Sequence, residues 1–157
     1  MQKIILIAGP TGSGKSEIAI RLAKIINGEI INADSMQVYK EIKILSARPE
    51  KIYNITHYLY GNISVKQNFS AGEWLKKVKL NLNKIIKKKK QPIFVGGTGL
   101  YFKLLTEGIS NIPKIPDSIR IKARKLNANL GNDKFYSLLI KLDPLVQNKI
   151  KKMIHID

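Results

Sequence analysis

The feature that most constrains the fold of this chain is a glycine-rich segment close to its start. It matches the pattern G-x-x-x-x-G-K-S/T in full and consists of Gly9, Pro10, Thr11, Gly12, Ser13, Gly14, Lys15 and Ser16. Residues 3–8 before it form an apolar run typical of a buried parallel strand. Residues 14–26 carry apolar side chains at helical spacing. A strand, this loop and a helix in that order predict a P-loop rather than a chance glycine-rich turn.

The P-loop pattern predicts a particular chemistry. Its glycines allow successive backbone N–H groups to point at phosphate oxygens, and the N-terminus of the following helix adds positive potential. Lys15 supplies a cation between phosphates, and the Ser16 hydroxyl is suited to ligate Mg²⁺. We therefore expect a bound di- or triphosphate with Mg²⁺, although the loop alone does not define the reaction.

Four further segments of the first 110 residues suggest regular structure. Residues 29–33 and 92–95 are expected to be buried strands, and 55–60 either a short strand or a loop. Residues 71–89 are expected to form a helix with an apolar stripe, opened by a capping box at Ser70. Trp74 lies on that stripe, so it is interpreted as a core residue. The fold class expected is α/β, a P-loop NTPase-like parallel sheet flanked by helices.

The chain changes character beyond Gly108. Prolines follow, and then three stretches with helical periodicity, at 117–129, 133–141 and 144–153. We expect two parts, a P-loop core over residues 1–110 and a helical segment over 111–157. Doubly wound P-loop sheets have about five strands, whereas three are clear here. The sheet is therefore expected to be incomplete and the chain truncated.

Composition excludes several classes of protein. The 157 residues contain no cysteine, which excludes disulfides and thiolate metal sites. The apolar run after Met1 is too short for a signal peptide, and no segment approaches the ~18 apolar residues of a membrane span. A cytoplasmic protein is expected. The net charge of +17 has two readings, a polyanionic partner or lysines accumulated on solvated faces by compositional drift.

Two more clusters of polar residues follow predicted strands. Asp34-Ser35-Met36-Gln37-Val38-Tyr39 comes after the second strand, and Gly96-Gly97-Thr98-Gly99-Leu100-Tyr101 comes after the third. Parallel sheets carry their sites at the carboxyl ends of strands, so both clusters should approach the P-loop. Asp34 could hold Mg²⁺ through water or accept a proton, or it could merely cap the next turn. Thr98 offers a hydroxyl, and Tyr101 is interpreted as a packing residue.

Taken together, the three blocks resemble the tRNA dimethylallyltransferase family, also called tRNA isopentenyl-diphosphate transferases. The blocks read GPTGSGKS, DSMQVYKEI and IFVGGTGLYFKLL, and their order and spacing fit that family. Lesser similarities occur at His57-Tyr58-Leu59, Phe69-Ser70-Ala71 and Leu142-Asp143-Pro144. Ser46-Ala47-Arg48-Pro49 is a mild departure from the family's Thr-Ala-Lys-Pro. The resemblance covers essentially the whole chain.

The resemblance implies a reaction and roles for residues. Such enzymes transfer a dimethylallyl group from dimethylallyl diphosphate to N6 of an adenosine beside the anticodon of tRNA. Gly9 to Ser16 would hold the diphosphate with Mg²⁺, Asp34 would act as general base, and Thr98 would position the reacting centre. The residues implied to contact tRNA are Asp34, Ser35, Met36, Gln37, Thr98 and Arg120. The segment 111–157 would begin an RNA-binding insertion, and a monomer is expected.

Alternatives remain at this point. The family continues with an Asn-Asp-x-Gln-Arg block, and here Ile156-Asp157 reaches its start without the Gln-Arg. A catalytically impaired RNA-binding fragment is therefore one alternative. A small-molecule or nucleotide kinase is another, but it needs lid arginines near the γ-phosphate. Only Arg120 and Arg124 lie in the later region, and the DSMQVY block has no obvious role in a kinase.

Overall fold

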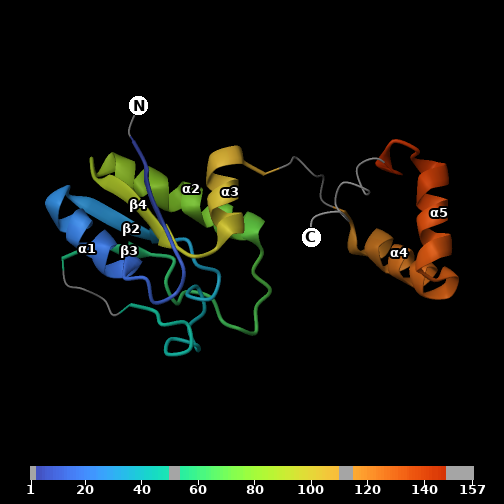
Figure 1. The fold of residues 1–157 in the computed structure, drawn as a ribbon, viewed down its shortest axis with the longest axis horizontal. Coiled ribbons are helices and arrows are strands. Elements are labelled where there is room, and N and C mark those ends of the chain that lie inside the picture. Colours follow the sequence, from blue (N-terminus) through green and yellow to red (C-terminus); the bar gives the residue numbers. More distant parts are fainter. Residues whose placement is uncertain (1–2, 50–53, 110–114, 148–157) are drawn as a thin grey trace. The chain divides into compact units, whose positions relative to one another are not determined.

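The computed structural model describes residues 3–49, 54–109 and 115–147 (Figure 1). The chain divides into two units, Met1–Ser110 and Asn111–Asp157. The first is an α/β unit and the second is helical, and each is described by itself. The role in RNA binding expected of the second unit stays a prediction.

The first unit is built on a parallel sheet of four strands. The strands are β1 (Ile5–Ala8), β2 (Gly28–Asn32), β3 (His57–Tyr58) and β4 (Gln91–Gly96), arranged in the order β1-β4-β2-β3. All three pairings are parallel. The expected parallel sheet is thus confirmed, and the segment left open at 55–60 contains a two-residue strand. The sequence did not indicate that β4 inserts between β1 and β2.

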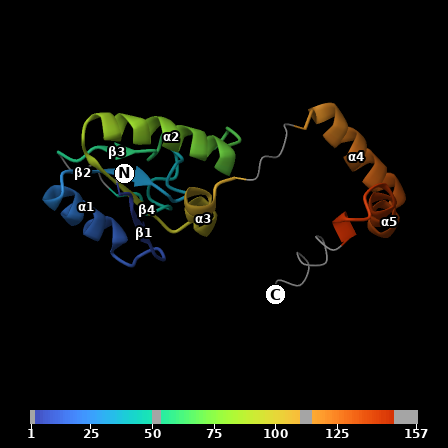
Figure 2. The same cartoon turned by 90° about the horizontal axis from the view of Figure 1, so that it is seen from above.

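Helices cover both faces of the sheet because neighbouring strand residues point to opposite sides. Helix α1 (Lys15–Ile25) lies on one face, and α2 (Ala71–Lys87) on the other (Figure 2). Ile30 packs into the cluster around α1, whereas Ile31 packs into the cluster that includes Trp74 and Val78. This alternation explains why β2 is buried throughout its length.

Trp74 anchors α2 to the sheet. Its side chain is fully buried, and its indole N–H donates to the backbone oxygen of Asn32 at 3.0 Å. Its ring stacks on Tyr101 of α3 (Gly99–Glu107), with centroids 4.0 Å apart and ring planes 12° apart. Helix α2 begins at the expected capping box between Ser70 and Glu73. The interpretation of Trp74 and Tyr101 as packing residues is confirmed.

The second unit contains α4 (Asp117–Leu130) and α5 (Asn132–Leu142), joined at Gly131, whose φ is 75°. Both helices were expected from periodicity. None of the described residues in these two helices is buried. The third helix expected, at 144–153, lies largely outside the described residues. Across the described parts of both units, no helix has the length and hydrophobicity needed to cross a membrane.

A buried carboxylate ties β2 to its neighbours at the amino end of the sheet. Glu29 is fully buried and accepts hydrogen bonds from the Tyr58 hydroxyl at 2.7 Å and the Lys88 ammonium at 3.2 Å. The Lys90 ammonium lies 3.0 Å from the same carboxylate. Burial raises the pKa of Glu29, but these three donors together lower it below its ordinary value. The ionised form is therefore the one that stabilises the fold.

We expect Glu29→Gln to lower the free energy of unfolding at pH 7 by about 1–3 kcal/mol, because two cations lose a buried anion. Since the folded pKa is lowered, this contribution is present above pH 4.5 and is lost as pH falls below it. Urea unfolding at pH 7 and at successively lower pH measures both effects. Glu17→Gln, in an exposed pair with Arg21, is the control and should change little. Equal effects of the two substitutions would contradict the assignment.

Candidate active site at the carboxyl edge of the sheet

The strand order brings three polar segments to one edge of the sheet. The P-loop follows β1, the segment starting at Ala33 follows β2, and Gly97 follows β4. Because the strands are parallel and β4 lies between the other two, its end separates the P-loop from Asp34. The structure thus brings together the P-loop, Asp34 and Thr98, as the sequence predicted.

Two glycines make this close approach possible. A Cβ atom on Gly96 would lie 2.0 Å from the backbone oxygen of Ala33. A Cβ atom on Gly97 would lie 3.1 Å from the backbone oxygen of Gly9 and 3.6 Å from Oδ2 of Asp34. The backbone N–H of Gly9 also donates to the oxygen of Gly96 at 3.3 Å. Backbone therefore packs against backbone where other residues would hold the segments apart.

The P-loop has the backbone geometry that the motif requires. Gly12 and Gly14 have φ values of 82° and 77°, a region that favours glycine. Helix α1 starts directly after Gly14, so no side chain at its cap position competes for its first N–H groups. Lys15 is largely buried, and its ammonium donates to the backbone oxygen of Pro10 at 2.8 Å. Ser16 lies on the first turn of α1 and is half-buried.

Asp34 is held by Asn32, a residue that sequence reasoning missed. The Asn32 side chain accepts from the backbone N–H of Asp34 at 2.9 Å and donates to the backbone oxygen of Asp34 at 2.9 Å. It also donates to the Leu59 oxygen at 3.1 Å. Asn32 is fully buried. The available signal was an asparagine inside a strand that is otherwise apolar near its end.

Asp34 was expected either to bind Mg²⁺ or a proton, or to cap the next turn; the structure shows the cap, and the other role stays a prediction. Oδ1 accepts from the Met36 N–H at 2.9 Å, so Asp34 does cap the next turn. Oδ2 lies beside Gly97 on the side of the P-loop. One oxygen is thus used to fix the loop, and the other lies close to Gly97.

Thr98 joins the β4 end to the Asp34 segment. Its hydroxyl accepts from the Ser35 N–H at 2.8 Å and donates to the Ser35 hydroxyl at 3.2 Å. Its backbone N–H donates to the Ala33 oxygen at 3.3 Å. In this structure Thr98 therefore positions the segment that carries Asp34.

The remaining residues expected to contact tRNA differ in how exposed they are and in the unit to which they belong. Met36 is 54% exposed, whereas Gln37 is 7% exposed. The side-chain amide of Gln37 donates to the backbone oxygen of Ser46 at 3.0 Å. Gln37 thus stabilises the loop that follows Asp34. Arg120 is exposed on α4 in the second unit, so it is not part of the geometry described for this edge.

The charge of Asp34 contributes to raising the pKa values of two tyrosines. Burial raises the pKa of Tyr101 to about 12, and the charges of Tyr39 and Asp34 add to this shift. Burial, followed by the charge of Asp34, also raises the pKa of Tyr60. Both phenols are therefore neutral at physiological pH.

The residues at this edge fit a magnesium ion bound jointly with phosphate. Ser16 and Asp34 offer oxygen ligands, which Mg²⁺ prefers, and Mg²⁺ commonly keeps waters and substrate phosphates in its shell. Within the described residues, no cluster of three or more His, Cys, Asp or Glu side chains could hold a metal by itself. A metal here would therefore depend on the bound diphosphate.

Comparison with solved structures defines the class of protein. A eukaryotic dimethylallyltransferase acting on tRNA superposes with a TM-score of 0.76 and 31% identity, covering 95% of this chain and 38% of that one. The tRNA isopentenylpyrophosphate transferase of Bacillus halodurans superposes with a TM-score of 0.69 and 28% identity, covering 93% and 49%. The chain therefore has the P-loop NTPase-like fold of the tRNA prenyltransferases.

Sequence comparison then gives the family. A family model described as IPP transferase matches residues 37–154, and the chain belongs to this family. The tRNA dimethylallyltransferase of Pelagibacter ubique is 54% identical over 149 residues, which are 94% of this chain and 48% of that protein. That of Ehrlichia canis is 45% identical over 148 residues, 94% of this chain and 49% of that protein. The chain thus spans about half the length of the curated relatives it matches.

We expect Gly96→Ala to disrupt this edge, because its Cβ would force β4 away from Ala33. Thermal unfolding should show a loss of about 1–3 kcal/mol, and affinity for inorganic pyrophosphate, measured by calorimetry, should fall at least tenfold. Gly99→Ala is the matched control, since apart from its chain neighbours and the backbone of its own helix no heavy atom lies within 4 Å of its Cβ position. A Gly96→Ala variant as stable and as tight-binding as Gly99→Ala would contradict the close approach.

Proposed function

We propose that the protein containing this chain transfers a dimethylallyl group from dimethylallyl diphosphate to N6 of an adenosine beside the anticodon of tRNA. The observation that carries the proposal is that Gly97 lies close both to the Asp34 carboxylate and to Gly9, where the P-loop starts. Such an arrangement suits a base that faces an electrophile attached to a diphosphate. Membership of the IPP transferase family supports this reading.

The donor's diphosphate is proposed to bind in the P-loop, Gly9 to Ser16. Its oxygens would accept hydrogen bonds from the loop's N–H groups and from the N-terminus of α1. Lys15 would exchange the Pro10 oxygen for a phosphate oxygen, which is the stronger, charge-assisted partner. Magnesium bound at Ser16 would supply positive charge that stabilises the pyrophosphate leaving group.

In the proposed reaction, the adenine N6 nitrogen attacks the allylic carbon of the donor. A nitrogen–carbon bond forms as the carbon–oxygen bond to diphosphate breaks, and pyrophosphate leaves with the electron pair. The N6 nitrogen becomes acidic as its new bond forms, and the free oxygen of Asp34 accepts the proton. Thr98 keeps the Asp34 segment in register through Ser35 and lies near the leaving oxygen in this scheme.

The tRNA partner is proposed on the basis of family and charge. The target base must leave its stack to reach Asp34. Ser35 and Met36 are accessible to that base to different degrees, while Gln37 acts through the loop it holds. Arg120 and the net charge of +17 would contribute salt-dependent contacts with phosphate. The monomeric state and the cytoplasmic location expected from the sequence stay predictions.

A second candidate function is RNA binding without turnover. The observation that favours it is the net charge of +17, which suits a polyanionic partner. A nucleotide kinase is a weaker candidate, because the segment from Asp34 to Tyr39 would have no role in phosphoryl transfer. The three functions differ in what they consume and what they bind.

Transfer of labelled dimethylallyl diphosphate to unmodified tRNA, with Mg²⁺ present, tests the proposal directly. We expect Asp34→Asn to lower the transfer rate at least 100-fold while leaving donor affinity within a few-fold, since general-base catalysis contributes about 10²–10⁴. Lys15→Ala should instead weaken donor binding. Steeply salt-dependent tRNA binding without label transfer would favour the RNA-binding function, and ATP-dependent phosphoryl transfer would favour the kinase.

The role of Thr98 can be separated from simple packing by two substitutions. We expect Thr98→Val to lower the transfer rate at least tenfold, because the Ser35 N–H loses its acceptor. Thr98→Ser keeps the hydroxyl and should restore most of the rate. If Thr98→Val instead keeps the full transfer rate, the hydroxyl is not needed and the positioning role is wrong.

A further inference from the structure

A loop without a role in the proposed reaction follows residues 34–39, which are called the acceptor segment below. The loop runs from Lys40 to Arg48 and closes on itself, because the backbone N–H of Arg48 donates to the Lys43 oxygen at 3.1 Å. Ala47 has a φ of 47°, a left-handed backbone conformation that helps to turn the chain back. The loop therefore returns Arg48 to the end of the acceptor segment.

The guanidinium of Arg48 binds the backbone at that end. Its Nη1 donates to the backbone oxygen of Tyr39 at 2.9 Å, and its Nη2 donates to the backbone oxygen of Lys40 at 3.5 Å. A cationic donor makes a stronger hydrogen bond to a carbonyl oxygen than a neutral donor does. The shorter of the two contacts therefore holds the chain at the point where the acceptor segment ends.

Arg48 fits at this position because residue 61 is glycine. A Cβ atom on Gly61 would overlap Nη1 of Arg48 and would lie 2.5 Å from its Cζ. The backbone N–H of Gly61 donates to the backbone oxygen of Gln37 at 2.9 Å, so Gly61 contacts the acceptor segment as well. Because an arginine side chain is flexible, a larger residue at position 61 would displace the guanidinium.

The two halves of the acceptor segment are held by different groups. Asn32 and Thr98 fix the first half through the backbone N–H groups of Asp34 and Ser35. The second half is held from the other side, by the Arg48 guanidinium and by backbone hydrogen bonds from residues 61–63. Arg48 can therefore set the shape of the segment without any contact with Asp34.

We propose that Arg48 is a positioning residue for the acceptor nucleotide and acts by holding the second half of the acceptor segment in the shape that binds the base. This inference rests on the proposed function, which makes residues 34–39 the part that contacts the acceptor. The donor site should not depend on Arg48, because β4 lies between the strand that leads to the P-loop and the strand that leads to the acceptor segment.

Prenyl transfer to unmodified tRNA, together with the affinities for tRNA and for pyrophosphate, tests the inference. We expect Arg48→Met, which removes the donors, to raise KM and Kd for tRNA about tenfold while kcat changes less than about twofold. Pyrophosphate affinity should stay unchanged. Arg48→Lys keeps a cationic donor and should remain within about threefold of the unaltered chain in tRNA affinity.

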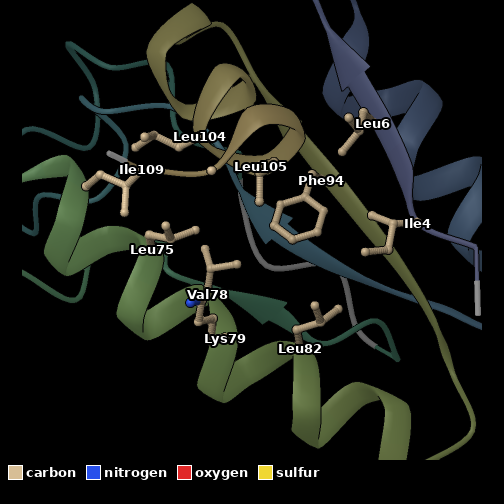
Figure 3. A pocket seen from close by; sticks show the side chains of 11 residues that line it. Ile4, Leu6, Leu75, Val78, Lys79, Leu82, Phe94, Leu104, Leu105 and Ile109 are labelled. Atoms are coloured by element: carbon tan, nitrogen blue, oxygen red, sulfur yellow. The ribbon is translucent and has the colours of Figure 1, made fainter. Parts of the chain in front are cut away.

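Two matched controls each remove one positive charge from elsewhere in the first unit. Arg21 is exposed on α1, where it pairs with Glu17. Lys79 is exposed on α2, at the apolar groove shown in Figure 3. Arg21→Met and Lys79→Met should each change tRNA affinity less than about twofold, because salt screens the effect of a single exposed charge.

Gly61→Ala tests the same contact from its other side. Its Cβ should displace the guanidinium, so tRNA affinity should fall about as far as in Arg48→Met, and the double variant should be little weaker than either single one. Gly108→Ala is the control for backbone strain, since Gly108 has a φ of 81°. Apart from its chain neighbours, no heavy atom lies within 4 Å of the Gly108 Cβ position. This control should leave tRNA affinity unchanged.

The outcomes separate this inference from the proposed function. Weaker tRNA binding by Arg48→Met, in a chain that transfers no prenyl group, would support the inference and contradict the function. Unchanged KM and Kd for tRNA in Arg48→Met, beside working transfer, would overturn the inference alone. Equal losses of tRNA and pyrophosphate binding, or additive effects of the Arg48 and Gly61 substitutions, would also overturn it. No tRNA binding by the unaltered chain would overturn both.

Discussion

The candidate site depends on the contact between the end of β4 and the backbone of Ala33. Gly96 lies so close to the Ala33 oxygen that no side chain fits between them. Because β4 occupies the position between β1 and β2, this contact fixes Gly97 beside both the P-loop and Asp34. The chemistry assigned to Lys15, Asp34 and Thr98 requires that these groups converge, and the glycines allow it.

A set of hydrogen bonds holds the segment that carries Asp34 in place. Asn32 uses its whole side-chain amide to fix the Asp34 backbone and the Leu59 oxygen, and it lies under Trp74. Thr98 fixes Ser35, and Gln37 fixes the loop beyond it. None of these partners needs to touch substrate to matter. Each reduces the freedom of the segment that carries Asp34, whose Oδ2 lies close to Gly97.

The two carboxylates near opposite ends of the sheet, Glu29 and Asp34, have different surroundings. At the amino end, Glu29 is surrounded by Tyr58, Lys88 and Lys90, which satisfy it and make it a structural anchor. At the carboxyl end, Asp34 uses Oδ1 to accept from the Met36 N–H, and no hydrogen bond to Oδ2 is seen among the described residues. A satisfied carboxylate stabilises the fold, whereas a carboxylate with unused capacity can act on a ligand.

Sequence by itself determined the features that depend on local chemistry. The P-loop, the capping box at Ser70, the stripe through Trp74 and the ends of most helices follow from short-range rules of backbone geometry and periodicity. The carboxyl-edge position of Asp34 and Thr98 followed from their place after predicted strands. Only the tertiary structure decided the strand order, the support of Asp34 by Asn32, and the inward position of Gln37. These depend on contacts between segments far apart in sequence, which no local pattern encodes.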